Sequence, residues 1–204
     1  MKVIVELNSA QRVSQAAFDL SGWVIASGDN RELPFAVVDK DAAQILVFGA
    51  DGKLRGIAPV LIGSAVGDDS AAGVGDRELK DIPAEDRTTP AGRYYSAFGP
   101  AIGNKSVLWV DYATSISVHA LPATKEAVKE KRKQRLASKT PGDNRITHGC
   151  INVSSTFYSK VVQPAFKKNG FFYILPETAP LTTAFPSFSK PDLVASSESA
   201  GEGE

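Results

Sequence analysis

The chain has 204 residues, 43% of them hydrophobic, which is enough for one well-packed domain with a single core. Its 23 Lys and Arg balance 23 Asp and Glu, and this zero net charge argues against nucleic-acid binding as the main function. No run approaches the roughly 18 apolar residues that a membrane-spanning helix needs. We therefore expect no nucleic-acid partner and no membrane span in this sequence.

The first third of the chain predicts one helix followed by strands. Ser9 is a suitable N-cap for a helix from Gln11 to about Ser27, where apolar residues recur near helical spacing, and Gly28 predicts its end. Strands are expected at 35–39, 43–49 and 54–63, with an Asp-Gly turn between the second and the third. Residues 64–89 are rich in Gly, Asp, Ser and Ala and predict a long loop, either functional or merely mobile.

Three further strands are predicted at 94–98, 106–112 and 115–120, and these tandem strands indicate an antiparallel or mixed sheet. A helix capped by Ser154 or Ser155 and a last strand at 171–175 follow later in the chain. From Pro186 the Ser, Glu and Gly content predicts a disordered tail.

A strongly basic segment, residues 125–136, separates two of these regions and predicts one helix that ends at Pro141-Gly142. Such a charge run is usually a solvated helix face. The functional alternative is a lid that bears on an anionic substrate, with Lys129, Arg132 and Arg135 acting as salt-screened surface charges.

The residues with the most distinctive chemistry gather at 145–153. This stretch holds Cys150, the only cysteine, and His148, one of two histidines. The other, His119, ends a run whose alternation predicts a strand. A cysteine nucleophile needs a base, because a free thiol has a pKa of roughly 8.5 and is mostly protonated at neutral pH. The two histidines are the candidate bases, and Gly149 permits a turn that brings main-chain N–H groups close to a ligand.

These residues carry a family resemblance. Thr147-His148-Gly149-Cys150-Ile151-Asn152 resembles the Ser/Thr-His-Gly-Cys-hydrophobic-Asn signature of the L,D-transpeptidases, the YkuD-type enzymes that remodel bacterial peptidoglycan. A strand-borne histidine precedes it, as in that family. Thr89-Pro90-Ala91-Gly92-Arg93-Tyr94-Tyr95 resembles the family's Thr-Pro-x-Gly-aromatic element, which lies beside the active site. The interval from His119 to Thr147 is longer than is usual there, so the basic segment is an insert that bears on substrate choice.

The resemblance implies a mainly β, α+β fold: a YkuD-like mixed sheet sandwich with an N-terminal helix and a helical insert between the two active-site segments. The catalytic domain would span 30–178, after a helical segment at 1–29 and before a disordered tail at 179–204. It also implies an exported enzyme of the periplasm or cell wall that acts on peptidoglycan stem peptides without a cofactor. Residues 1–10 are too short and too acidic for a signal peptide, so the export signal is expected to be missing from this chain.

The resemblance also implies the roles of single residues. Cys150 is the nucleophile and His119 its base, with the Ala120 carbonyl orienting the imidazole. The N–H groups of Gly149 and Cys150 are the expected oxyanion donors. The residues expected to bind substrate or brace the site are Arg145, Thr147, His148, Asn152 and Tyr95.

Several alternatives stay open at this stage. Cys150 alone reads as a small buried hydrophobe, and His119 alone as a core imidazole. A metal site formed by His119, His148 and Cys150 lacks any CxxC or HxxxH spacing, and no metal is expected. The same thiol site suits a carboxypeptidase or another thiol amidase, and the fold suits an inactive wall-binding module.

Overall fold

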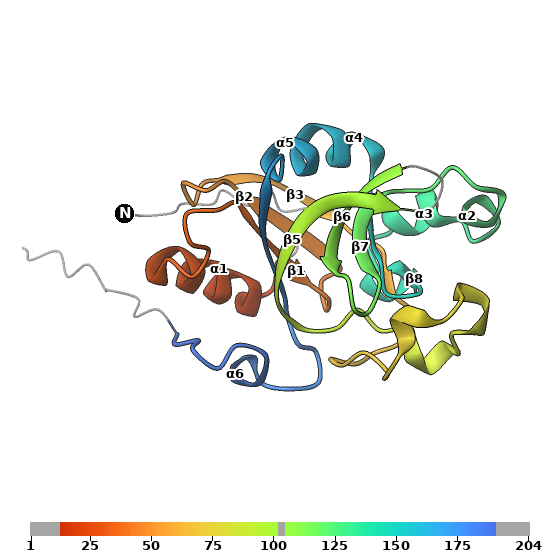
Figure 1. Ribbon diagram of the computed structural model, residues 1–204, viewed down its shortest axis with the longest axis horizontal. Coiled ribbons are helices and arrows are strands. Elements are labelled where there is room, and N and C mark those ends of the chain that lie inside the picture. Colours follow the sequence, from red (N-terminus) through yellow and green to blue (C-terminus); the bar gives the residue numbers. More distant parts are fainter. Residues whose placement is uncertain (1–12, 102–104, 191–204) are drawn as a thin grey trace, which may run out of the picture.

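The computed structural model describes residues 13–101 and 105–190, and its centre is one mixed sheet of eight strands in the order β3-β2-β1-β10-β5-β6-β7-β9 (Figure 1). A separate parallel pair joins β4 to β8. The strands are β1 Phe35–Asp39, β2 Gln44–Phe48, β3 Leu54–Pro59, β4 Ile62–Gly63, β5 Gly92–Ala101, β6 Lys105–Asp111, β7 Ile116–Ala120, β8 Arg145–Thr147, β9 Ile151–Val153 and β10 Asn169–Ile174.

Short helices flank this sheet. They are α1 Gln15–Ser27, α2 Lys125–Lys129, α3 Arg132–Leu136, α4 Ser155–Phe157, η5 Tyr158–Val162, α5 Gln163–Ala165 and α6 Leu181–Ala184, with single turns η1 Val74–Asp76, η2 Leu79–Asp81, η3 Ala84–Asp86 and η4 Pro141–Asn144. The predicted class, mainly β with flanking helices in an α+β arrangement, is confirmed. No helix in the described ranges is long and apolar enough to cross a membrane.

Some helix boundaries differ from the predictions because other residues cap or interrupt the helix. Helix α1 begins at Gln15, because the Ser14 hydroxyl accepts a hydrogen bond from the Ala17 N–H at 3.1 Å. The expected cap, Ser9, lies outside the described residues. The predicted end is confirmed, since Gly28 adopts the left-handed conformation with φ of 69°. The single helix expected at 125–136 is wrong: Lys131, with φ of 55°, divides it into α2 and α3.

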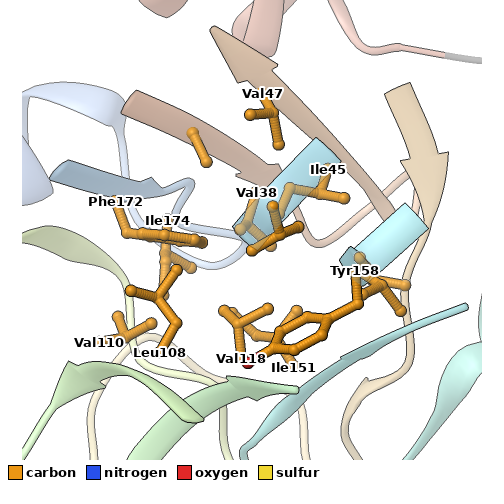
Figure 2. Packing of buried hydrophobic residues seen from close by; sticks show 14 of the residues in the cluster. Val38, Ile45, Val47, Leu108, Val110, Val118, Ile151, Tyr158, Phe172 and Ile174 are labelled. Carbon is orange, nitrogen blue, oxygen red and sulfur yellow. The ribbon is translucent and has the colours of Figure 1, made fainter. Parts of the chain in front are cut away.

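The buried apolar side chains within 13–101 and 105–190 form two hydrophobic clusters, not the single core expected. Strands from both ends of the sheet and the α4–α5 segment contribute side chains to the larger cluster, so the sheet curls around it. Figure 2 shows Val118 and Ile151 of this cluster facing Tyr158 and Val38. The smaller cluster lies between α1 and the opposite face of β1 and β10. Two clusters form because successive side chains of a strand point to opposite faces and both faces are covered.

Part of the segment expected to be a disordered tail is folded. Helix α6 packs near α1 (Figure 1), Phe185 is buried, and the Phe188 ring meets Trp23 edge-on at 5.9 Å between centroids. The prediction of disorder is therefore wrong for 179–190, and residues 191–204 lie outside the described ranges. Phe185 and Phe188 give this segment apolar area to bury despite its polar composition.

The long loop 64–89 is tied to the sheet by a buried lysine. Lys40 is 2% exposed, and its Nζ donates to the carbonyls of Gly67 (2.6 Å) and Thr89 (3.1 Å) and to Asp68 Oδ1 (2.9 Å). The Asp68 carboxylate also accepts hydrogen bonds from the N–H groups of 177–179. These contacts join the loop to the segment after β10 and place its end, Thr89, beside the cysteine turn.

Candidate active site

Cys150 lies on the tight turn between β8 and β9, and Gly149 makes that turn possible. Gly149 has a φ of 122°, and a Cβ there would lie 2.6 Å from both the Thr88 carbonyl oxygen and the Ile116 Cδ1. Both the conformation and the space require glycine. The turn leaves Cys150 half-buried, with its Sγ beside β7.

The parallel pairing of β7 with β9 brings the base to the thiol. In this register His119 stands opposite Asn152, so the imidazole lies two residues along β9 from Cys150. The His119 Nδ1 lies 2.8 Å from the Ala120 carbonyl oxygen, so Nδ1 carries the proton and Nε2 presents a lone pair. The Cys150 thiol lies close enough to this imidazole for each group to shift the pKa of the other.

Each of the two groups changes the other's titration. Burial lowers the pKa of His119, but the hydrogen bond to Cys150, the charge of the thiolate and the Ala120 carbonyl raise it more, and the pKa lies above its usual value. Burial raises the pKa of Cys150, but the hydrogen bond and the charge of His119, together with hydrogen bonds from the Ser117 hydroxyl and main chain, hold it below its usual value. This arrangement favours a thiolate–imidazolium pair, the nucleophilic form of a cysteine.

Ser117 is a site residue that the sequence reasoning missed. Its hydroxyl lies 3.6 Å from the Cys150 Sγ, and the Ser115 carbonyl oxygen lies at the same distance. Ser117 shares a face of β7 with His119, two residues on, so strand alternation was a signal that could have found it.

Two threonines hold the cysteine turn. The Thr147 hydroxyl donates to the Cys150 carbonyl at 2.7 Å and accepts from the Gly149 N–H at 3.1 Å. The Thr89 hydroxyl donates to the Gly149 carbonyl at 2.7 Å and accepts from the Gly63 N–H at 2.9 Å. The Gly149 N–H, expected to serve an oxyanion together with that of Cys150, is thus engaged inside the turn.

His148, which was expected to bind substrate, directly precedes Gly149 on the cysteine turn. His148 is half-buried, and its pKa is lowered by burial and by the charges of Arg87 and Arg132, against the effect of Glu130. Its imidazole is therefore neutral at neutral pH.

The structure gives Arg145 and Tyr95 partners away from the thiol. Arg145 forms an ion pair with Glu177, whose side chain is 3% exposed, and donates to the Ala65 carbonyl at 3.3 Å. Tyr95 lies on β5, two strands from β7 in the sheet, and its exposed ring meets Phe171 edge-on at 5.5 Å. The structure does not bring either residue together with Cys150 and His119.

The lysines of the basic insert are exposed, as expected of a solvated face, but two of its arginines are partly buried and have partners. The Arg132 side chain is 13% exposed; it forms an ion pair with Glu130 and donates to Asn152 Oδ1 at 3.0 Å. Arg135 donates to the carbonyls of Glu130 and Asp143. Lys129, by contrast, is exposed. The insert therefore contacts the centre through Arg132, which the charge pattern alone did not distinguish from its neighbours.

No group of three or more His, Cys, Asp or Glu side chains within 13–101 and 105–190 is arranged to hold a metal ion. The residues that meet at Cys150 are suited to covalent chemistry at the thiol: a nucleophile, a base with a fixed tautomer, and hydroxyl and main-chain donors around the sulfur.

No protein-family model and no curated protein matches this chain. Among solved structures, the chain is similar to the helical cell shape determining protein Pgp2 from Campylobacter jejuni, with 18% identity, a TM-score of 0.47 and coverage of 72% of this chain and 49% of that one. The K307A mutant of that protein is similar with 16% identity and a TM-score of 0.45, over 82% of this chain and 58% of that one. The LD transpeptidase LdtMt1 in complex with imipenem is similar with 13% identity and a TM-score of 0.41, over 70% of this chain and 58% of that one. The chain spans between about half and three fifths of these proteins, and likenesses this distant leave the question of function to the site itself.

Proposed function

We propose that this protein is a cysteine acyltransferase of the L,D-transpeptidase type, acting on peptidoglycan stem peptides in the periplasm or cell wall. The observation that supports it best is the parallel pairing of β7 with β9, which sets His119 opposite Asn152, two residues from Cys150, with its Nδ1 oriented by the Ala120 carbonyl. The substrate class rests on the sequence signature at 147–152 and on the Thr89 segment, which contacts that signature at Gly149.

In the proposed reaction, His119 Nε2 takes the thiol proton and Cys150 Sγ attacks the carbonyl carbon of an L,D peptide bond. The C–N bond breaks, the imidazolium gives its proton to the departing amino group, and the D-amino acid leaves an acyl-thioester on Cys150. An amine from a second stem then attacks the thioester carbon while His119 takes its proton. The new C–N bond forms, the C–S bond breaks, and the imidazolium returns the proton to the Cys150 sulfur. With water as the acceptor, the same steps give carboxypeptidase activity.

The tetrahedral intermediate of this reaction needs hydrogen-bond donors for its oxyanion. We assign the Cys150 N–H to this role, since the Gly149 N–H is engaged by Thr147. Asn152 and Thr147 act by holding the base and the turn, and His148 is assigned to the substrate groove.

The test is intact-mass analysis after incubation with a carbapenem and, separately, with tetrapeptide-stem muropeptides. One carbapenem adduct per chain is expected, because the thiol opens the lactam and the chain has a single cysteine. Cys150→Ala is the matched control and should stay unmodified. Folded protein that remains unmodified by both reagents would favour an inactive module, and turnover of non-wall peptides alone would favour another thiol amidase.

A further inference from the structure

Arg132 links the insert to the catalytic base through one amide. Its Nε lies 2.6 Å from Glu130 Oε2, and its Nη1 lies 3.0 Å from Asn152 Oδ1. The Asn152 Nδ2 in turn lies 3.2 Å from His119 Nε2. Asn152 is fully buried, and its own backbone N–H and carbonyl each bond to Leu61 at 2.9 Å, so the amide is held on a rigid element.

Hydrogen-bond chemistry fixes which way this amide faces. A guanidinium only donates, so the atom of Asn152 that faces Arg132 must be the carbonyl oxygen Oδ1. The NH₂ group then faces His119, and since it also only donates, Nε2 must accept with its lone pair. The Ala120 carbonyl makes the matching demand at Nδ1. Arg132 therefore selects the Nδ1–H tautomer whenever the His119 imidazole is neutral.

The same contacts disfavour the protonated base. Once His119 Nε2 carries a proton, it meets the NH₂ of Asn152 donor to donor. The amide cannot rotate to offer its oxygen, because the NH₂ group would then face the guanidinium. The positive charge of Arg132 also opposes a second positive charge on His119.

We propose that Arg132, held by Glu130, is a positioning residue that keeps the Asn152 NH₂ directed at His119 Nε2 and so limits the stability of the imidazolium, which then readily gives up the proton that it takes from the thiol. A less stable imidazolium is a stronger acid toward the departing amine, which couples the insert to both proton transfers. The proposal rests on the proposed function only in taking His119 as the base.

The charged groups that act on His119 are Cys150, which stabilises its proton, and Arg132, which opposes it. Glu130 lies behind Arg132 and offsets its charge. His148 is influenced by Arg132 and Glu130 through charge and makes no contact with the Asn152 amide among the described hydrogen bonds. The two histidines can thus separate the effect of the amide from that of charge alone.

The test is an NMR titration of ¹⁵N-labelled histidine, which reports both the tautomer and the titration midpoint of each imidazole. The chain has only two histidines, so two sets of signals are expected. Cys150→Ser serves as the parent, because it removes the coupled titration of the thiol. Arg132→Met removes charge and donor, Arg132→Lys keeps the charge and one donor, and Glu130→Gln keeps an acceptor for Arg132 while removing the offsetting charge. Lys133→Met is the matched control, since it removes a charge from an exposed position of the same helix.

Arg132→Met should raise the His119 midpoint more than that of His148 and allow a mixture of tautomers. Arg132→Lys should stay near the parent, Glu130→Gln should lower the His119 midpoint, and Lys133→Met should leave the difference between the two histidines unchanged. If the His119 midpoint shifted in the same direction in Arg132→Met and Glu130→Gln, the cause would be a general loosening of the site, and the proposal would be overturned. Equal shifts of the His119 and His148 midpoints in Arg132→Met would also overturn it. If Arg132→Met does not fold, a raised midpoint in Glu130→Gln is the overturning result. The titration needs no substrate, so a protein that carbapenem does not acylate can still pass or fail it.

Discussion

The Thr89 hydroxyl donates to the Gly149 carbonyl at 2.7 Å and so joins two segments that lie 60 residues apart in the chain. Thr89 is 2% exposed, and the same hydroxyl accepts from the Gly63 N–H. Thr89→Val keeps the shape but leaves a buried N–H and a buried carbonyl without their partner. We expect a loss of about 2–4 kcal/mol in the free energy of unfolding, measured in urea. Thr156→Val, at an exposed position, should change it by less than about 0.5 kcal/mol, and an equal loss in both variants would refute this role.

The cysteine turn should tolerate no side chain at position 149. Gly149→Ala would place a Cβ 2.6 Å from the Thr88 carbonyl oxygen at a φ of 122°, and it should cost about 2–4 kcal/mol of stability and slow acylation. Gly142→Ala is the matched control, because no atom lies within 4 Å of a Cβ there. Denaturant unfolding measures both variants. A Gly149→Ala protein as stable as the control would contradict the packing described.

The two histidines should differ in the pH dependence of acylation. The pKa of Cys150 is lowered and that of His119 is raised, and both shifts favour the thiolate–imidazolium pair, so the acylation rate should depend on pH through both titrations. His119→Ala should lower the rate roughly 10²–10⁴-fold and move the rising limb toward the free-thiol value near ~8.5.

His148→Ala should keep both limbs and cost mainly substrate affinity, because its imidazole is neutral near pH 7. The measurement is the carbapenem acylation rate across pH in both variants. If the rising limb moved in His148→Ala and stayed in place in His119→Ala, the assignment of the base would have to be reversed.

Lys40 should be among the most costly positions to neutralise. Lys40→Met would leave Asp68 and Glu177 without their buried cation, and breaking such a network typically costs about 3–5 kcal/mol. Lys53→Met, at an exposed ion pair, is the control and should be nearly neutral. Thermal and urea unfolding measure both, and similar midpoints for the two variants would show that the loop is not anchored as described.

The Asp68 carboxylate should contribute to acid sensitivity. Burial raises its pKa, but hydrogen bonds from Thr178, Lys40 and the main chain outweigh it, so the folded pKa lies below the unfolded value of about 3.9. A depressed pKa adds stability that is complete above the unfolded value and is lost as the pH falls below it. The wild-type protein should therefore lose stability between about pH 4 and pH 2 more steeply than Asp68→Asn. Parallel stability curves for the two proteins would exclude this contribution.

The sequence by itself determined the local features of this protein. Alternating apolar residues gave most strands within a few positions, Gly28 ended the first helix, and Asp51-Gly52 formed the predicted turn, with Gly52 at a φ of 71°. Residue type and motif also indicated Cys150, His119 and Gly149 as candidate site residues. The predictions of strands, helix end and turn are confirmed because alternation, caps and turns depend on neighbours a few residues away.

Only the tertiary structure decided which distant groups meet. The parallel register of β7 and β9 places His119 opposite Asn152. The hydrogen bonds of the buried Lys40 fix the end of the long loop, so that Thr89 lies beside Gly149. The charge pattern of the insert could not show that Arg132, alone among its basic neighbours, reaches Asn152. Strand register depends on which side chains are buried together in the two clusters, and buried ion pairing depends on the desolvation of the charged groups. Both are set by residues far along the chain.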